Sequence, residues 1–176
     1  MKYKQTEGAD KTILWLIVGF TIFILVLIGF VAIGEKKESK KVGQVVSYQI
    51  KDSEKPITSF ETETKNLGNM KVSDEKSEDF SIRNTGTKPL SLFNINSSCG
   101  CTVGVVTING QKSPEGAMHL KNSWIGTVNP GESAIVTVIY RPSVMPVKGD
   151  VSRSVYVDTN DPANKMLTFT VTAFVE

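Results

Sequence analysis

Cysteine and histidine are scarce in this chain of 176 residues: it has two cysteines, Cys99 and Cys101, and one histidine, His119. A zinc finger or a scaffold of several disulfides needs more of these residues, so both classes are excluded. The formal net charge is only +2. Nucleic-acid binding depends on a strongly basic surface, so this balance argues against a nucleic-acid partner.

The motifs of the common enzyme classes are missing as well. The chain has no Walker loop and no glycine pattern of a dinucleotide-binding site. A Ser-His-Asp triad would have to use His119, and no serine is set in a nucleophile-elbow pattern. We therefore predict no catalytic residues and expect that the protein is not an enzyme.

One long apolar run is present, at residues 13–33, and it contains no charged residue. Its roughly 21 residues at ~1.5 Å each make a helix of ~31 Å, which matches the hydrocarbon core of a bilayer. A cleaved signal peptide has a shorter apolar core and a small-residue cleavage site, which residues 31–33 do not provide. The run therefore predicts an uncleaved single-pass transmembrane helix after a cytosolic tail of residues 1–12.

Lysines flank this run on both sides, so the positive-inside rule nearly cancels. The very short N-terminal tail favours an N-terminus inside the cell and a C-terminal part beyond the cytoplasmic membrane. Residues 34–56 begin with a lysine cluster that we expect among lipid headgroups, and they predict a juxtamembrane tether. The lipid bilayer is thus the first predicted partner.

From residue 57 to the C-terminus, apolar and polar residues alternate with the period of a β-strand. The alternation is clearest at residues 80–83, 134–140, 151–157 and 167–175. It changes phase near Leu92 and Phe93, which predicts a bulge there, and Asn109 and Gly110 predict a tight turn. Many short strands, frequent turns and no amphipathic helix predict an all-β fold: an immunoglobulin-like antiparallel β-sandwich of about seven or eight strands over residues 57–176.

Several short motifs occur in the order and rough spacing of a bacterial protein family. They are Asn-Leu-Gly-Asn-Met at residues 66–70, Phe-Ser-Ile-Arg-Asn-Thr-Gly at 80–86, Pro-Leu at 89–90, Ser-Cys-Gly-Cys-Thr at 98–102, Asn-Pro-Gly-Glu at 129–132 and Thr-Asn-Asp-Pro at 159–162. Residues 57–176 thereby resemble the exported domains of unknown function that carry the Ser-Cys-Gly-Cys-Thr motif, which are similar to Hydin-like and major-sperm-protein-like immunoglobulin-like domains. The resemblance implies a fold and a place in the cell envelope, but no reaction.

Cys99 and Cys101 are the strongest candidates for chemistry. In a flat strand the Cα atoms of residues i and i+2 lie ~6.5–7 Å apart, at the limit for a disulfide, and a bend at Gly100 shortens that distance. One hypothesis is structural: a local disulfide, or two half-buried small side chains. A second is redox exchange with a partner, which requires an exposed thiolate.

A third hypothesis is a Cu(I) site. Two thiolates suit this soft metal, and a third ligand could come from the loop or from a methionine further away. The candidate third ligands are Met118, His119 and Met70. An intermolecular disulfide is the remaining possibility. The favoured function is a membrane-anchored, non-enzymatic module that binds or scaffolds another cell-envelope protein, with thiol redox exchange or Cu(I) handling as the alternative.

Overall fold

The computed structural model describes residues 13, 15–24, 45–120 and 122–176, and the chain divides into two units, Met1–Lys41 and Val42–Glu176. In the first unit, residues 13 and 15–24 are helical and their side chains are exposed. Within the described ranges, no helix has the length and apolar character that crossing a membrane requires. Much of the predicted span, residues 14 and 25–33, lies outside the described residues, as do the predicted tail 1–12 and residues 34–44. The span therefore stays a prediction.

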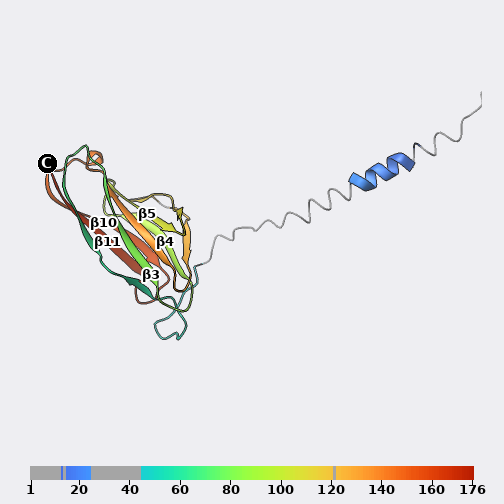
Figure 1. Ribbon diagram of the computed structural model, residues 1–176, viewed down its shortest axis with the longest axis horizontal. Coiled ribbons are helices and arrows are strands. Elements are labelled where there is room, and N and C mark those ends of the chain that lie inside the picture. The colour runs from blue at the N-terminus through green and yellow to red at the C-terminus, as the bar shows by residue number, and fades with distance from the viewer. Residues whose placement is uncertain (1–12, 14, 25–44, 121) are drawn as a thin grey trace, which may run out of the picture. The chain divides into compact units, whose positions relative to one another are not determined.

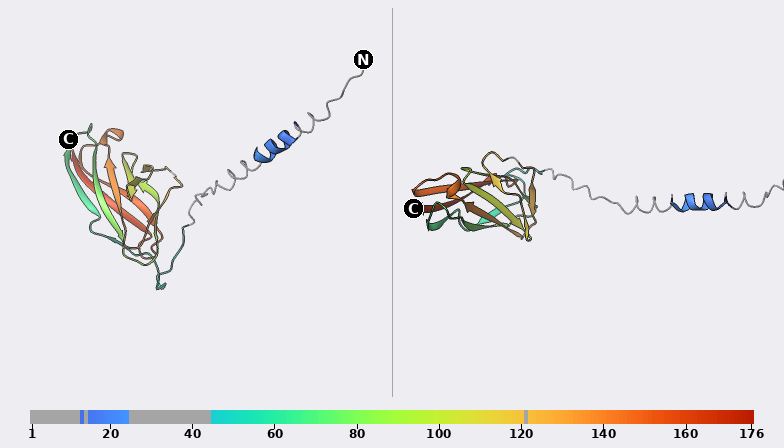
Figure 2. Two further views of the ribbon diagram at one scale, coloured as in Figure 1. Left: turned by 45° about the vertical axis from the view of Figure 1, so that its right-hand side comes forward. Right: turned by 90° about the horizontal axis from the view of Figure 1, so that it is seen from above.

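The second unit consists of strands in two sheets (Figures 1 and 2). Its described elements are β1 (Thr58–Phe60), β2 (Thr64–Met70), β3 (Lys76–Asn84), β4 (Leu90–Ser97), β5 (Thr102–Ile108), β6 (Gln111–Lys112), β7 (Gly116–Ala117), β8 (Ile125–Val128), β9 (Ser133–Tyr140), the 3₁₀ helix η1 (Pro142–Val144), β10 (Gly149–Thr159) and β11 (Met166–Val175). One sheet has the order β1-β3-β9-β5-β6 with β7 beside β5, and the other has the order β2-β11-β10-β4-β8. The predicted all-β class is confirmed. The described residues form eleven strands, more than the seven or eight expected. The difference comes from β1, β6 and β7, which have only two or three residues each.

The alternating apolar residues of both sheets face each other and form the core. The ring of Phe169 in β11 is at its centre, with ring centroids 5.1 Å from Phe80 and 6.1 Å from Phe60. Such aromatic pairs add to the stabilisation from burial alone. Strand β9 lies between β3 and β5 in its sheet. This central position explains why its outer face also carries apolar side chains, Ile135 and Ile139.

Two local predictions are confirmed. Strand β4 carries a bulge at Asn94, which has a φ of 50°, and the register with β10 shifts there: Tyr156 pairs with Asn96, but Asp158 pairs with Phe93. The tight turn between β5 and β6 has positive φ at both central residues, 50° at Asn109 and 79° at Gly110. That geometry matches the twist of the two flanking strands.

The prediction of an antiparallel sandwich is wrong for one pair of strands. Strand β2 runs parallel to β11, with Thr64 opposite Thr170 and Met70 opposite Val175. A short hairpin forces two strands to be antiparallel, but β2 reaches β11 only through the rest of the domain. The direction of β2 is therefore set by packing at the edge of the sheet and not by a turn.

Residues 45–56, the second half of the expected tether, contain no strand and lie against one end of the sandwich. The Nδ2 atom of Asn160 donates a hydrogen bond to the carbonyl of Val46 over 3.2 Å. Lys88 and Glu54 form an ion pair with an N–O distance of 2.7 Å. These contacts hold residues 45–56 against the sandwich.

Candidate functional site

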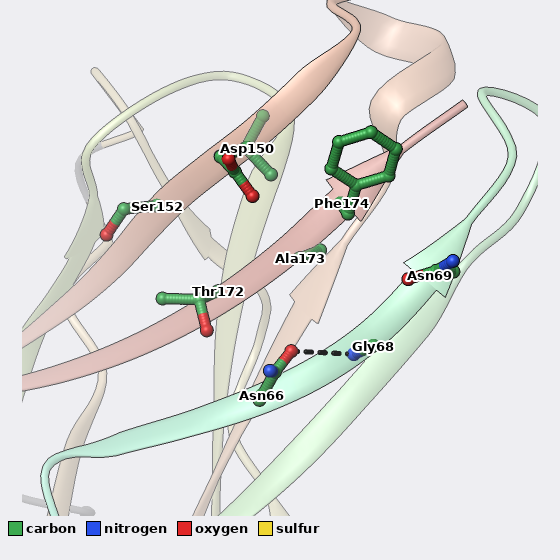
Figure 3. A pocket seen from close by; sticks show the side chains of 9 residues that line it. Asn66, Gly68, Asn69, Asp150, Ser152, Thr172, Ala173 and Phe174 are labelled. Carbon is green, nitrogen blue, oxygen red and sulfur yellow. Dashed lines mark hydrogen bonds between the residues drawn. The ribbon is translucent and has the colours of Figure 1, made fainter.

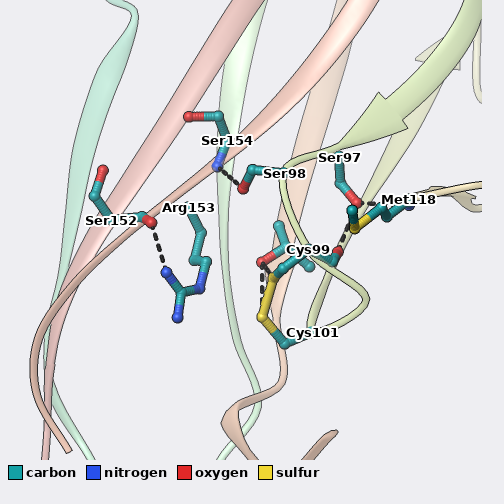
Figure 4. The surroundings of a disulfide bond; sticks show 9 residues. Ser97, Ser98, Cys99, Cys101, Met118, Ser152, Arg153 and Ser154 are labelled. Atoms are coloured by element: carbon teal, nitrogen blue, oxygen red, sulfur yellow. Dashed lines mark hydrogen bonds between the residues drawn. A yellow bond between two sulfur atoms is a disulfide. The ribbon is translucent and has the colours of Figure 1, made fainter. Parts of the chain in front are cut away.

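Cys99 and Cys101 lie in the connection between β4 and β5, where they form a disulfide with a Cα–Cα distance of 5.3 Å (Figure 4). The chain turns at Gly100, and the backbone N–H of Thr102 donates to the carbonyl of Cys99 over 3.3 Å. This turn brings the two Cα atoms closer than the spacing of a flat strand allows. The arrangement is the local disulfide of the structural hypothesis.

The disulfide is shielded from solvent. Cys99 is 9% exposed and Cys101 is 1% exposed. The hydroxyl of Ser97 donates to the carbonyl of Cys99 over 2.8 Å and accepts a hydrogen bond from the backbone N–H of Met118 over 2.9 Å. Exchange with another protein requires a thiolate to reach one of the sulfur atoms. The burial of both cysteines therefore favours a structural role.

A guanidinium group also belongs to the surroundings of the disulfide. Arg153 of β10 is drawn there in Figure 4, and its Cζ atom lies 5.7 Å from the ring centroid of Tyr140. The Nε atom of Arg153 and the hydroxyl of Tyr140 are buried and make no hydrogen bond within the described residues. A cation beside a thiol favours the thiolate form. Arg153 is thus one cationic residue in the surroundings of the disulfide.

The candidate third ligands for Cu(I) lie in different surroundings. Met118 is 41% exposed, His119 lies next to it in a turn with a φ of 66°, and Met70 is buried in the core. In the part of the chain that the structure describes, no group of three or more histidine, cysteine, aspartate and glutamate side chains could hold a metal ion. Cu(I) binding also requires reduction of the disulfide, so that hypothesis applies only to the reduced chain.

The motif at residues 80–86 has a structural role. Asn84, the last residue of β3, is fully buried. Its Nδ2 atom donates to the carbonyls of Lys88 and Val128 over 2.8 and 2.9 Å, and its Oδ1 atom accepts from the N–H of Gly86 over 3.0 Å. Its backbone bonds to the turn at residues 129–132. One asparagine therefore joins the ends of several strands.

The Thr-Asn-Asp-Pro motif does the same in the connection between β10 and β11. Asn160 accepts a hydrogen bond from the N–H of Ser91 over 2.8 Å. The carboxylate of Asp161 accepts hydrogen bonds from the N–H of Thr58 over 2.8 Å, the N–H of Ala163 over 2.9 Å and the side chain of Asn164 over 3.0 Å. These residues lie at the end of the sandwich opposite to the disulfide, since β4 runs from Leu90 to Ser97 between the two ends. The carboxylate of Asp161 thereby caps the turn that contains Pro162.

An ion-pair cluster was not predicted from the sequence. The guanidinium of Arg141 binds Glu75 over 2.5 Å and Glu115 over 2.9 Å. The hydrogen bond from Arg141 holds the pKa of Glu115 below its ordinary value, and the same bond raises the pKa of Arg141. The two acidic residues are 66 and 26 positions away from Arg141 in the chain. No local pattern indicates such a contact.

The fold defines an immunoglobulin-like β-sandwich in which Asn84, Asn160 and Asp161 hold the ends of several strands together. The chain belongs to the family described as "Protein of unknown function (DUF1573)", which it matches over residues 58–175. A comparison with curated proteins finds no match.

A solved structure supports the fold. A protein of unknown function from Porphyromonas gingivalis W83 is similar with a TM-score of 0.52 and 16% identity, over 69% of this chain and 47% of that chain. The chain thus spans about half the length of that protein. Human CEP192 PapD-like domain 7 is similar with a TM-score of 0.43 and 13% identity, over 76% of this chain and 97% of that chain. At such identities the similarity concerns the fold alone.

Proposed function

We propose that this chain is a non-catalytic module of the bacterial cell envelope, anchored by residues 13–33 with its N-terminus inside, whose sandwich binds another envelope protein. The length and composition of the apolar run support the anchor. The Cys99–Cys101 disulfide supports a place outside the cytoplasm, because disulfides persist in oxidising compartments and are rare in the cytosol.

The observation that carries the binding role is a difference between the two edges of the five-stranded sheet. At the β2 edge, the Nζ atom of Lys76 donates to the carbonyls of Leu67 and Asn69 over 3.0 and 2.7 Å. A charged side chain over the backbone acceptors of an edge hinders pairing with another strand. The β2 edge is therefore protected.

The other edge strand, β8, is open by comparison. Its four residues pair only with β4, and among the described residues no side chain bonds to the backbone of Ile125, Gly126 or Thr127. A depression of about 340 Å³ lies between β8 and the β5–β6 hairpin. An extended peptide that adds to such an edge gains main-chain hydrogen bonds, while pockets beside the edge select its side chains.

Trp124 supplies an apolar anchor at this edge. It is only partly buried and lines the depression. A Cβ atom on Gly126 would clash with the Trp124 ring, so the glycine lets the indole lie directly on β8. Partly buried tryptophans are frequent anchors of protein interfaces. The edge of β8 together with Trp124 is the binding surface that this proposal names.

The test is site-specific photo-crosslinking in intact cells. A photoreactive residue replaces Thr127 on β8 or, as a matched control, Ser81 on β3; both positions are exposed within strands. We expect a discrete protein adduct from position 127 and none from position 81. If position 127 gives no adduct, or if both positions give the same ones, the proposed binding edge is wrong.

A second candidate function, thiol redox exchange or Cu(I) handling, is favoured by the position of Arg153 beside the disulfide. Mass measurement before and after thiol alkylation shows whether Cys99 and Cys101 are bridged. Titration of the reduced chain with Cu(I) against a competing chelator then measures the affinity for the metal. If the variant with Cys99→Ser and Cys101→Ser keeps full function in cells, only the structural role remains.

A further inference from the structure

A second depression, of about 380 Å³, lies on the outer face of the five-stranded sheet, where β2, β11 and β10 run side by side (Figure 3). Its polar and aromatic lining consists of two amides, two hydroxyls, one carboxylate and one ring: Asn66, Asn69, Ser152, Thr172, Asp150 and Phe174. None of its lining residues is basic. It is distant from the end where residues 45–57 join the sandwich.

Phe174 departs from the pattern of its strand. The three outward positions of β11 directly before it carry threonines, at residues 168, 170 and 172, whereas the inward positions are apolar and buried. Phe174 points outward and is 45% exposed, while its neighbours Ala173 and Val175 are buried. The ring adds nothing to the core. It instead presents an apolar face at the rim of the depression, beside the carboxylate of Asp150 (Figure 3).

The polar groups around this ring are set in place and available. Asp150 is opposite Phe174 in the register of β10 and β11, and it makes no ion pair among the described residues. The Oδ1 atom of Asn66 accepts a hydrogen bond from the N–H of Gly68 over 2.8 Å. This bond orients the Asn66 amide, so both hydrogens of its NH₂ group are free to donate to a ligand.

The hydroxyl side chains continue along the sheet from the depression. Ser152 pairs with Thr172, and Ser154 pairs with Thr170. The hydroxyl oxygens of Ser154 and Thr170 are 2.9 Å apart. Neighbouring strands are ~4.8 Å apart, so the hydroxyls of the two rows lie close together. The rows on β10 and β11 therefore offer a repeating set of short donors and acceptors.

We propose that this depression binds a neutral polysaccharide. A sugar ring combines hydroxyls, which both donate and accept hydrogen bonds, with an apolar face of C–H groups. Carboxylate, amide and hydroxyl groups bond the former, and the exposed ring of Phe174 stacks on the latter. An anionic polymer needs cations, and Asp150 would repel it. The surface is separate from the β8 edge, so either proposal can fail without affecting the other.

The test uses the full chain in phosphatidylcholine nanodiscs, since detergents with sugar headgroups would compete for the site. Retention is measured on beads of chitin, cellulose, amylose and mannan, with polygalacturonate beads as the anionic comparison. We expect retention on at least one neutral polymer, with an apparent Kd that changes little between about 0.1 and about 0.5 M salt, because no charge pairing is involved.

Two variants and their matched controls locate the site. Phe174→Ala and Asp150→Asn each weaken the apparent Kd roughly tenfold. Met166→Ala, an exposed position on the same strand, and Glu63→Gln, an exposed carboxylate outside the depression, leave it unchanged. All four positions are exposed, so unchanged melting temperatures confirm folding. The proposal is overturned if no neutral polymer retains the chain, if polygalacturonate retains it better, or if Phe174→Ala binds as tightly as the parent.

Discussion

Single polar residues decide much of the stability at the end of the sandwich where Asp161 lies. Asp161 is 1% exposed, and its carboxylate accepts hydrogen bonds from two donors of its own loop, Ala163 and Asn164, and from Thr58 in β1. Burial alone raises the pKa of Asp161, but the hydrogen bonds from Asn164, Thr58 and Ala163 outweigh it and hold the pKa below the ordinary value. The ionised carboxylate is therefore part of the folded structure.

Asp161→Ala is expected to lower the free energy of unfolding by about 3 kcal/mol, because it leaves buried donors without an acceptor. The measurement is denaturant unfolding of the full chain in detergent micelles. Asp74→Ala is the control, because it also removes one carboxylate, at an exposed turn between β2 and β3. The Asp74 carboxylate accepts a local hydrogen bond from the N–H of Lys71. Equal losses in both variants would contradict the role of Asp161.

The same carboxylate predicts a pH dependence. A pKa that is lower in the folded chain than in the unfolded one stabilises the fold fully above the unfolded value, which is about 4. This stabilisation is lost as the pH falls through the lower pKa of the folded chain. Asp161→Asn cannot titrate, so we expect the stability difference between parent and variant to shrink as unfolding is measured from pH 7 down to about pH 3. A constant difference would contradict the lowered pKa.

Removal of the disulfide is expected to have a modest effect on stability. The bridge closes a ring of only three residues, for which the loss of chain entropy corresponds to about 1–2 kcal/mol. The variant with Cys99→Ser and Cys101→Ser should have a free energy of unfolding lower by that amount, seen as a lower denaturant midpoint. A reductant should shift the parent chain toward the variant and leave the variant unchanged. A reductant effect on the variant would show that another process is measured.

At the scale of elements, the edge strands differ in how they are protected. Strand β2 has seven residues and would be a template for another strand if its carbonyls were free. The lysine that covers them comes from β3 in the opposite sheet, so the protection requires both sheets to be in place. Strand β8 has only four residues, and its open edge is correspondingly short.

Lys76→Met is therefore expected to promote self-association by opening the β2 edge. The bulk of the side chain is kept, while the donors to Leu67 and Asn69 are lost. Analytical ultracentrifugation of the full chain in micelles at rising concentration measures the effect. Lys71→Met removes an exposed lysine between β2 and β3 whose side chain makes no such bonds among the described residues. This variant should self-associate no more than the parent. Association of both variants would instead point to net charge as the cause.

At the scale of the whole molecule, the predicted topology has a direct test. A C-terminal epitope tag should be removed by protease from spheroplasts while a cytosolic marker stays protected, and alkaline carbonate should leave the chain in the membrane pellet. Deletion of residues 13–33 should release it from the membrane. A tag that is digested only after lysis would contradict the proposed orientation and with it the compartment.

Sequence reasoning predicted the parts of the fold that local pattern controls. The period-two alternation in β9, β10 and β11, the bulge in β4 and the hairpin at Asn109 and Gly110 depend on residues close together in the chain. The parallel pairing of β2 with β11 could not be predicted, because nothing nearby in the chain sets it. The same holds for Arg141 and its two acidic partners.

The candidate sites, too, were predicted only where residues close together in the chain form them. The spacing of Cys99 and Cys101 pointed to the region of the disulfide but left its state open, since the distance between their Cα atoms depends on the turn. Phe174 carried a signal that sequence reasoning passed over: an apolar residue at an outward position after three threonines. Its neighbours Asn66 and Asp150 come from other strands, so only their pairing shows a common site.

The amino-acid sequence by itself determined the anchor prediction, the all-β class and the main turns, because hydrophobic runs and short-range periodicity act through neighbouring residues. The tertiary structure decided which edge is covered by Lys76, how the motif asparagines tie strand ends together and which polar side chains meet around Phe174. Those features depend on contacts between residues many positions apart, and such contacts exist only once the two sheets have packed.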